Sequence, residues 1–274
     1  MTICLVIKCK DAIVVAADSL SVSSGGSTSK YVNKIRVIQS GYLYHPVVVA
    51  GAGASAFIDK FIDRCQRGIE SYCMQKRQNM SDSKYKVDIV DFAEELGESV
   101  VSNLYMEYVN NRAKMGIKEL DGVYNLGLLV SGATREGELR SFYIYEVGLS
   151  ENIESYGTIG SGSSYANFFL RNLSSEESSL SVIDACNLAL HTVKAAEIMD
   201  RNVGGMAKIT VLERKNTAEG ETSLIVSSFP HDEERDREAL AEMVSLIKET
   251  GSRMRQVATK QPSGDQTPLE VEIS

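Results

Sequence analysis

The chain has 274 residues, of which 43% are hydrophobic, and a formal net charge of −8. A chain of this length and apolar content can bury a core of its own, and an acidic chain without a cluster of Lys and Arg is not expected to bind nucleic acid. No apolar run approaches the roughly 20 residues of a membrane-spanning helix, so we expect a cytoplasmic protein without membrane partners.

The five cysteines are scattered along the chain and form no C-x-x-C pair; they are Cys4, Cys9, Cys65, Cys73 and Cys186. Isolated thiols within apolar patterns are typical of reduced, buried cysteines in a cytosolic protein rather than of disulfides or a zinc site. The three histidines are equally isolated. We therefore expect neither a metal ion nor a cofactor.

The chain begins with two predicted strands. Residues 2–8 and 12–19 are nearly continuous apolar runs, and the short polar link between them predicts a hairpin. Because the apolar residues are consecutive rather than alternating, both strands are predicted to be buried on both faces. A loop rich in Ser and Gly follows at 21–29, and two more strands are predicted at 34–39 and 42–50.

The apolar period then changes to about four residues, which predicts helices. The first helix is predicted over 53–77, and a second stripe runs from Ile89 to Tyr108. The remaining predicted elements are strands 124–133, 139–147 and 153–160, helices 163–173 and 180–200, and strands 206–213 and 222–228. Helix pairs between runs of hairpin-linked strands predict an α/β protein with an αββα sandwich, in which helices cover both outer faces of two stacked sheets.

The C-terminal end differs in composition from the rest of the chain. Residues 231–258 are charged and have a helical pattern, whereas 259–274 contain two of the four prolines. A polar segment rich in Pro, Ser and Gly is typical of a flexible tail. We therefore predict a main domain over 2–230, a charged helix over 231–258 and a flexible tail over 259–274.

A glycine-rich stretch at 51–56, GAGASA, matches the dinucleotide fingerprint G-x-G-x-x-G/A. The fingerprint also needs an acidic residue about 20 positions later, at the end of a second parallel strand. That position is Glu70, inside the predicted first helix. We therefore predict no dinucleotide site, and interpret the glycines as a backbone bend whose N–H groups can face a site.

The stretch GTIGSGSSY at 157–165 is a second junction of strand, glycine and helix. A cap formed by Ser163 or Ser164 at the start of the helix would explain it. A loop that presents hydroxyl and amide groups to a site would explain it equally well. The stretch alone leaves both interpretations open.

Thr2 directly follows Met1. A threonine hydroxyl is a poor nucleophile without a base, and an N-terminal threonine supplies a base in its own α-amine, whose reference pKa is about 7.7–8.0. Methionine aminopeptidases act before small residues such as threonine, so we expect Met1 to be removed. Such a site also needs a cation to lower the pKa of the hydroxyl, a carboxylate to hold the cation, and N–H donors for an oxyanion.

Three residues at the ends of predicted strands could meet these needs. Asp18 ends the second strand, Lys34 begins the third, and Gly51 follows the fourth. Each also has an ordinary interpretation, since a loop Asp is usually a cap and a Lys that opens a strand is usually solvated. The hypothesis therefore depends on their occurring together.

The segments MT, AADS, SKYVNKI, VAGAGA, GSGS and MDRNVGG together resemble the proteasome β-subunit family of N-terminal-nucleophile threonine peptidases. The resemblance covers residues 2–228 and implies that family's four-layer αββα sandwich. Threonine follows Met1 without a propeptide, which is similar to the bacterial proteasome homologues.

The resemblance also implies roles for particular residues. The family's catalytic residues fall on Thr2 (nucleophile), Asp18 (conserved acid), Lys34 (lysine), Gly51 (oxyanion amide), Ser161 (serine near the amine) and Asp200 (second aspartate). The substrate-binding pocket for the residue before the cleaved bond falls on Ser21, Val32 and Val49, and the small, apolar Val49 favours uncharged side chains. One position departs from the family, because Val203 stands where the family usually has a serine.

By resemblance, the chain is a threonine endopeptidase that forms a ring-shaped homo-oligomer, cleaves peptides or proteins inside it, and has an ATPase or unfoldase as a candidate regulator. Two alternatives stay open. A non-catalytic scaffold of the same fold would account for Val203, and a related hydrolase of small amides would more often have Cys or Ser as its nucleophile. A scaffold would not need to keep Thr2, Asp18 and Lys34 together.

Overall fold

The structure is a computed structural model, and it describes residues 2–22, 29–117, 126–171, 180–216, 222–229 and 232–259. Most of the predicted tail, 260–274, lies outside the described residues, as does part of the predicted Ser/Gly loop. None of the described helices is long and apolar enough to cross a bilayer.

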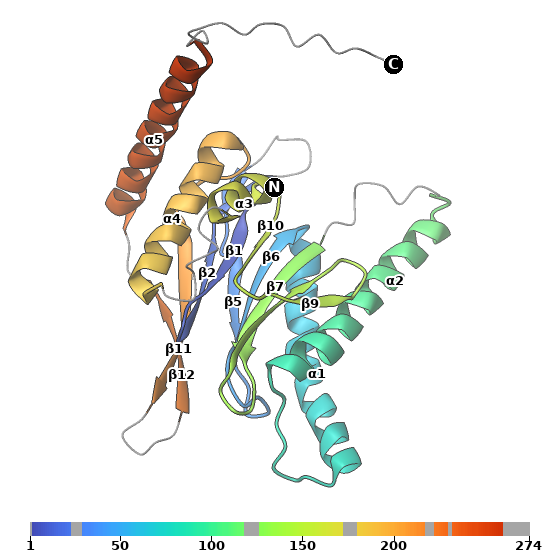
Figure 1. Cartoon of the computed structure of the whole chain (residues 1–274). Helices are drawn as coiled ribbons and strands as arrows, with labels where there is room; N and C mark the ends of the chain where they lie inside the picture. The colour runs from blue at the N-terminus through green and yellow to red at the C-terminus, as the bar shows by residue number, and fades with distance from the viewer. Residues whose placement is uncertain are drawn as a thin grey trace, which may run out of the picture.

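Two five-stranded antiparallel sheets form the centre of the molecule (Figure 1). The first sheet has the order β10 (Tyr156–Ile159), β1 (Cys4–Lys8), β2 (Ala12–Ala17), β11 (Lys208–Asn216) and β12 (Thr222–Ser228). The second has the order β5 (Ile35–Ile38), β6 (Val47–Gly53), β7 (Leu126–Ala133), β8 (Leu139–Ile144) and β9 (Ser150–Asn152). A separate short hairpin joins β3 (Leu20–Val22) to β4 (Ser29–Tyr31).

Helices cover the outer face of each sheet (Figure 1). The second sheet is covered by α1 (Ser55–Met80) and by a π-helix, η1 (Asp91–Gly97), that continues into α2 (Glu98–Lys114). The first is covered by α3 (Ser163–Arg171) and α4 (Val182–Met199), and α5 (Glu233–Thr259) packs on α4. The predicted αββα sandwich is therefore confirmed.

The burial of β1 explains its unbroken apolar sequence. Ile3, Leu5 and Ile7 face the layer of α3 and α4, whereas Cys4 and Val6 face the second sheet. Successive side chains of a strand point to opposite faces, and here both faces are covered. The predicted hairpin with β2 is also present, with Cys4 opposite Ala17 and Lys8 opposite Ile13.

The fourth strand begins and ends later than predicted, at Val47 and Gly53 instead of 42 and 50. Pro46 cannot donate a ladder hydrogen bond, and the preceding residues instead pair with the segment around Val87. Within the glycine-rich stretch 51–56, for which a bend was predicted, β6 continues through Gly51, and Gly53 has the left-handed conformation, with φ of 113°.

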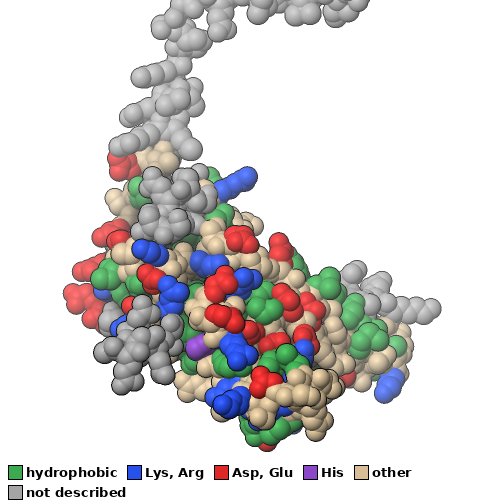
Figure 2. Space-filling view, turned by 60° about the horizontal axis from the view of Figure 1, so that its bottom comes forward, with side chains coloured by type: hydrophobic (Ala, Val, Ile, Leu, Met, Phe, Trp, Pro, Cys, Tyr) green, Lys and Arg blue, Asp and Glu red, His purple; other side chains and the backbone are tan. Residues whose placement is uncertain are grey.

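All five cysteines are free thiols, and four of them are buried. On the face shown in Figure 2, described acidic and basic side chains are interspersed with apolar ones. Within the described ranges, no three His, Cys, Asp or Glu side chains group in a way that could hold a metal ion.

Candidate active site

The candidate site lies where the hairpin of β1 and β2 approaches the ends of β5 and β6. The ladder of this hairpin pairs Cys4 with Ala17, and the Asp18 N–H donates to the Ile3 carbonyl at 3.2 Å. An antiparallel register of this kind fixes which residues lie opposite each other. Thr2 and Asp18, which lie just beyond this pairing, are therefore neighbours although they are 16 positions apart in the sequence.

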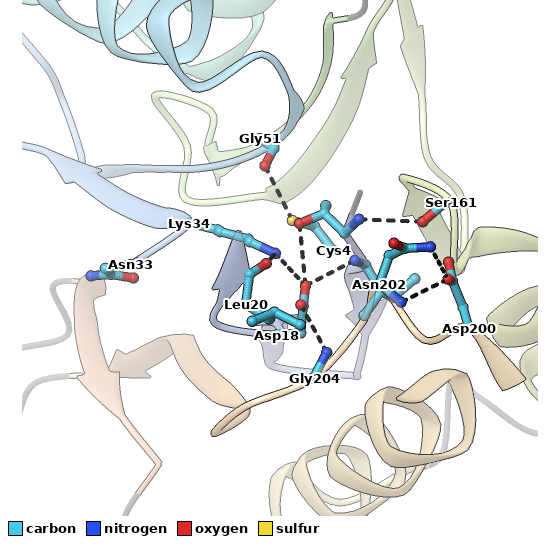
Figure 3. Close-up of polar contacts among 12 residues, drawn as sticks. Cys4, Asp18, Leu20, Asn33, Lys34, Gly51, Ser161, Asp200, Asn202 and Gly204 are labelled. Carbon is cyan, nitrogen blue, oxygen red and sulfur yellow. Dashed lines mark hydrogen bonds and ion pairs between the residues drawn. The ribbon is translucent and has the colours of Figure 1, made fainter. Parts of the chain in front are cut away.

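Asp18 is fully buried and is the centre of the site (Figure 3). Its Oδ1 accepts hydrogen bonds from Lys34 Nζ at 2.6 Å, the Ile3 N–H at 2.9 Å and the Thr2 hydroxyl at 3.3 Å. Its Oδ2 accepts one from the Gly204 N–H at 3.2 Å. A buried carboxylate is costly unless it is paired and hydrogen-bonded, and here each oxygen has donors.

Lys34 brings a positive charge next to the Thr2 hydroxyl. Its side chain is only 7% exposed, and its Nζ donates to the Leu20 carbonyl at 2.6 Å as well as to Asp18. The ammonium and the hydroxyl share one carboxylate oxygen, so both lie within hydrogen-bond distance of the same atom. A fixed cation in such a water-poor position stabilises negative charge that develops on a neighbouring oxygen.

Ser161 lies at the backbone nitrogen of Thr2, and Asp200 lies on the side of Ser161 with Asn202 (Figure 3). The Thr2 N–H donates to Ser161 Oγ at 3.3 Å, and Ser161 donates in turn to Asp200. Burial alone would raise the pKa of Asp200, but hydrogen bonds from Ser161 and Asn202 outweigh it and hold this pKa below its ordinary value. Asp200 is therefore a carboxylate at neutral pH and orients the Ser161 hydroxyl.

Gly51 lies at the site, but its N–H already has a partner. It donates to the Lys34 carbonyl at 3.2 Å, while the Gly51 carbonyl accepts a hydrogen bond from the Cys4 thiol at 3.4 Å. A Cβ at this position would lie 2.8 Å from the Ile58 side chain of α1, so the close approach of α1 requires glycine. The role of Gly51 as an oxyanion donor stays a prediction, since a substrate would have to compete for this amide.

The three predicted substrate-binding residues differ in exposure. Ser21 on β3 and Val32 just after β4 are both half-buried, and the Val32 N–H donates to the Ser19 carbonyl at 2.8 Å. Val49 is fully buried in the apolar cluster between β6 and the layer of α1 and α2. Their role in binding a substrate stays a prediction, and Val49 has no exposed surface that could contact one.

The sequence did not reveal the part that the Gly204 amide plays beside Asp18. The Gly204-Gly205 pair was the available signal, because Gly205 has φ of 76° and a Cβ there would lie 2.6 Å from Ser19 Oγ. Only glycine adopts such a turn without strain. Cys4 is the buried, free thiol that the sequence predicted, but its hydrogen bond to the Gly51 carbonyl was not predicted. Burial raises the pKa of Cys4 to about 12, so it is a neutral thiol.

Val203 has a structural explanation. It is 2% exposed and belongs to the apolar cluster between the first sheet and the layer of α3 and α4, which also includes Ile3. A Cβ on Gly162 would lie 3.1 Å from its Cγ2 atom, so the packing around it is tight. An apolar side chain fits this position, where a serine hydroxyl would be placed among hydrocarbon groups.

Comparison with known protein families identifies the fold. The proteasome subunit family matches residues 2–212. The chain belongs to the proteasome subunit family. The resemblance inferred from the sequence is therefore confirmed, and its matched region includes every residue predicted for the site. It ends before β12 and α5, which are the last strand of the first sheet and the C-terminal helix.

Solved structures similar to this proteasome-family chain include three described as Anbu. Anbu from Yersinia bercovieri, described as an ancestral beta-subunit, has a TM-score of 0.64 at 17% identity and covers 96% of this chain and 100% of its own. Anbu from Hyphomicrobium sp. strain MC1 has a TM-score of 0.62 at 16% identity, with coverage of 96% and 100%. A helical assembly of the Anbu complex from Pseudomonas aeruginosa has a TM-score of 0.62 at 15% identity, with coverage of 96% and 98%. The search of curated proteins gave no match.

Proposed function

We propose that this protein is a threonine endopeptidase whose nucleophile is the hydroxyl of Thr2, made N-terminal by removal of Met1. The observation that supports this most directly is the convergence on Asp18 Oδ1 of the Lys34 ammonium at 2.6 Å and the Thr2 hydroxyl at 3.3 Å. Ser161 Oγ, 3.3 Å from the Thr2 nitrogen, completes the set of groups that a terminal threonine would use. Membership of the proteasome subunit family supports the same activity.

In the proposed reaction, the free α-amine of Thr2 takes the proton of its own hydroxyl, and Oγ1 attacks the peptide carbonyl carbon. Lys34 stabilises the negative charge on Oγ1, and the Gly51 N–H is proposed to stabilise the oxyanion of the tetrahedral intermediate. The amine then gives its proton to the leaving nitrogen as the peptide bond breaks, which leaves an ester on Thr2. Water, deprotonated by the same amine, hydrolyses the ester and restores the hydroxyl.

We further propose that the chain assembles with itself into a ring-shaped homo-oligomer in the cytoplasm and cleaves peptides or unfolded proteins within it. The family and the Anbu helical assembly from Pseudomonas aeruginosa support self-association. An ATPase or unfoldase would then be the partner that delivers protein substrates.

A non-catalytic scaffold is the second candidate, and two observations favour it. The Gly51 N–H donates to the Lys34 carbonyl instead of being open to a substrate, and the buried Val203 has no hydroxyl where the family usually has a serine. A scaffold of this fold would assemble in the same way but would neither need Met1 removal nor react with an inhibitor at Thr2.

Intact mass and a peptide epoxyketone separate the two candidates. The endopeptidase should have the mass of residues 2–274 and bind one epoxyketone per chain, because this reagent needs a hydroxyl and a free α-amine on one residue to form its ring adduct. Thr2→Ala should abolish labelling, and Thr2→Ser should retain part of it. Thr158→Ala on β10 is a matched control that removes a threonine hydroxyl elsewhere.

Each outcome distinguishes the candidates. Met1 retained in protein that still cleaves peptides would disprove the mechanism, because the base would then be an amide. Met1 retained in inactive protein would support the scaffold. Labelling that survives in Thr2→Ala would place the nucleophile elsewhere.

A further inference from the structure

A buried lysine lies behind the candidate active site and has no part in the mechanism above. Lys194 on α4 has a side chain only 2% exposed. Its Nζ donates to the Gly205 carbonyl at 2.9 Å and to Glu197 at 2.8 Å, and it pairs with Asp236 of α5. An ammonium has three donors, and here each has an acceptor from a different part of the chain.

The acceptors of Lys194 connect it to the turn that faces Asp18. Gly204 donates its N–H to Asp18 Oδ2 at 3.2 Å and accepts from the Leu20 N–H at 2.9 Å, while the next carbonyl, that of Gly205, accepts from Lys194. Consecutive residues of one turn are therefore bonded to the active-site carboxylate and to the buried lysine.

Asp236 fixes the same turn at a second point. Its Oδ1 accepts a hydrogen bond from the Ala207 N–H at 3.0 Å, and its other oxygen pairs with Lys194. Asp236 lies in the first turn of α5, a helix outside the part of the chain that the family matches. The C-terminal helix thus reaches the turn through one carboxylate.

We propose that Lys194 and Asp236 are positioning residues for the threonine peptidase reaction, because together they hold the turn over 200–207 so that the Gly204 N–H stays on Asp18. The inference rests on the proposed function, since Asp18 is assigned its role there. A buried ion pair contributes little net stability compared with apolar residues of similar volume, so stability alone does not explain these charges. Their hydrogen bonds with two backbone groups of the turn, the Gly205 carbonyl and the Ala207 N–H, explain why the charges are there.

Two variants test the proposal with one matched control. Asp236→Asn keeps an oxygen for the Ala207 N–H but removes the charge that faces Lys194, and Lys194→Met also removes the donor to Gly205. Glu242→Gln is the control, because Glu242 of α5 pairs with His191 of α4 at 2.8 Å, so it joins the same two helices, and its side chain is 70% exposed. Peptide turnover and hydrogen exchange of the segment 200–207 are measured for each.

We expect kcat to fall between about 10-fold and 100-fold in both variants with KM within about twofold, since small displacements of catalytic groups cost this much. Exchange of the Gly204 amide, whose N–H donates to Asp18, should become faster, and the control should change neither quantity. Unchanged kcat and exchange in Asp236→Asn would overturn the proposal, as would equal losses of activity in Asp236→Asn and Glu242→Gln, which would indicate only weakened helix packing.

The exchange measurement does not depend on activity. If the wild-type protein cleaves no peptide, the proposed function fails, yet faster exchange of the turn in Asp236→Asn would still show that the two charges hold it. If Lys194→Met does not fold, the near-isosteric Asp236→Asn variant still decides the question.

Discussion

Lys34 is the residue on which electrostatic stabilisation of the Thr2 oxygen depends. Lys34→Met should reduce peptide turnover to background, because it removes the ammonium that shares Asp18 Oδ1 with the Thr2 hydroxyl. Lys34→Arg should also fail, because a planar guanidinium cannot replace a compact point charge held between a carboxylate and a carbonyl. Cleavage of a fluorogenic peptide beside a thermal melt is the measurement, and substantial turnover in either folded variant would contradict the role of Lys34.

The same substitution should also lower stability, which the sequence alone did not predict for a lysine at the start of a strand. Breaking a buried ion pair leaves Asp18 charged and costs about 3–5 kcal/mol. Asp18 keeps two backbone N–H donors in the variant, so we expect the lower end of that range. The double variant Asp18→Asn with Lys34→Met is the control, and it should melt at a higher temperature than Lys34→Met alone because neither charge remains.

At the scale of elements, the local sequence pattern predicts contacts that follow from the pairing of two consecutive strands. It does not predict which groups meet when segments far apart in the sequence come together. Consecutive apolar residues and a short polar link predict the hairpin of β1 and β2, and the hairpin alone brings Thr2 beside Asp18. The Gly204 N–H reaches Asp18 across 186 positions, and nothing in the local pattern indicates which amide of the turn would do so. The partner of the Gly51 N–H likewise depends on how β5 pairs with β6.

Asp200, at the start of the loop between α4 and β11, makes a pH-dependent contribution to the free energy of unfolding. Its pKa is lowered in the folded protein, so it contributes stability above the pKa of an unfolded aspartate, about 3.9, and this contribution is lost as the pH falls through the lower folded value. Asp200→Asn should therefore be less stable than wild type at pH 7, and the difference should shrink below about pH 4. Chemical denaturation between pH 3 and 7, with the exposed Asp59→Asn of α1 as the control, measures this, and a difference that grows on acidification would contradict it.

In the molecule as a whole, three apolar clusters hold the layers together. One lies between the second sheet and α1 and α2, one lies between the two sheets, and one lies between the first sheet and α3 and α4. Ala239 of α5 belongs to the last of these, so the C-terminal helix is part of the packed molecule although the family match ends at Leu212. The predicted division into a domain over 2–230 and a separate helix stays a prediction. Because of these contacts, we interpret α5 as a layer that the main domain needs for its stability.

A pair of truncations tests that interpretation for the whole chain. Deletion of 260–274 should leave melting temperature and self-association unchanged, because the composition of this segment predicts no packed structure. Deletion of 232–274 should lower both the melting temperature and turnover. It removes the side chains of Ala239 and Met243, which are only 3% and 5% exposed in the packed α5, and so uncovers α4. It also removes Asp236, the partner of Lys194. Size-exclusion chromatography, thermal melts and peptide cleavage compare the two with the full chain. Loss of the assembly in the shorter deletion would show that the tail takes part in subunit contacts, higher peptide cleavage there would show that it obstructs access to Thr2, and full activity after the longer deletion would show that the site does not depend on α5.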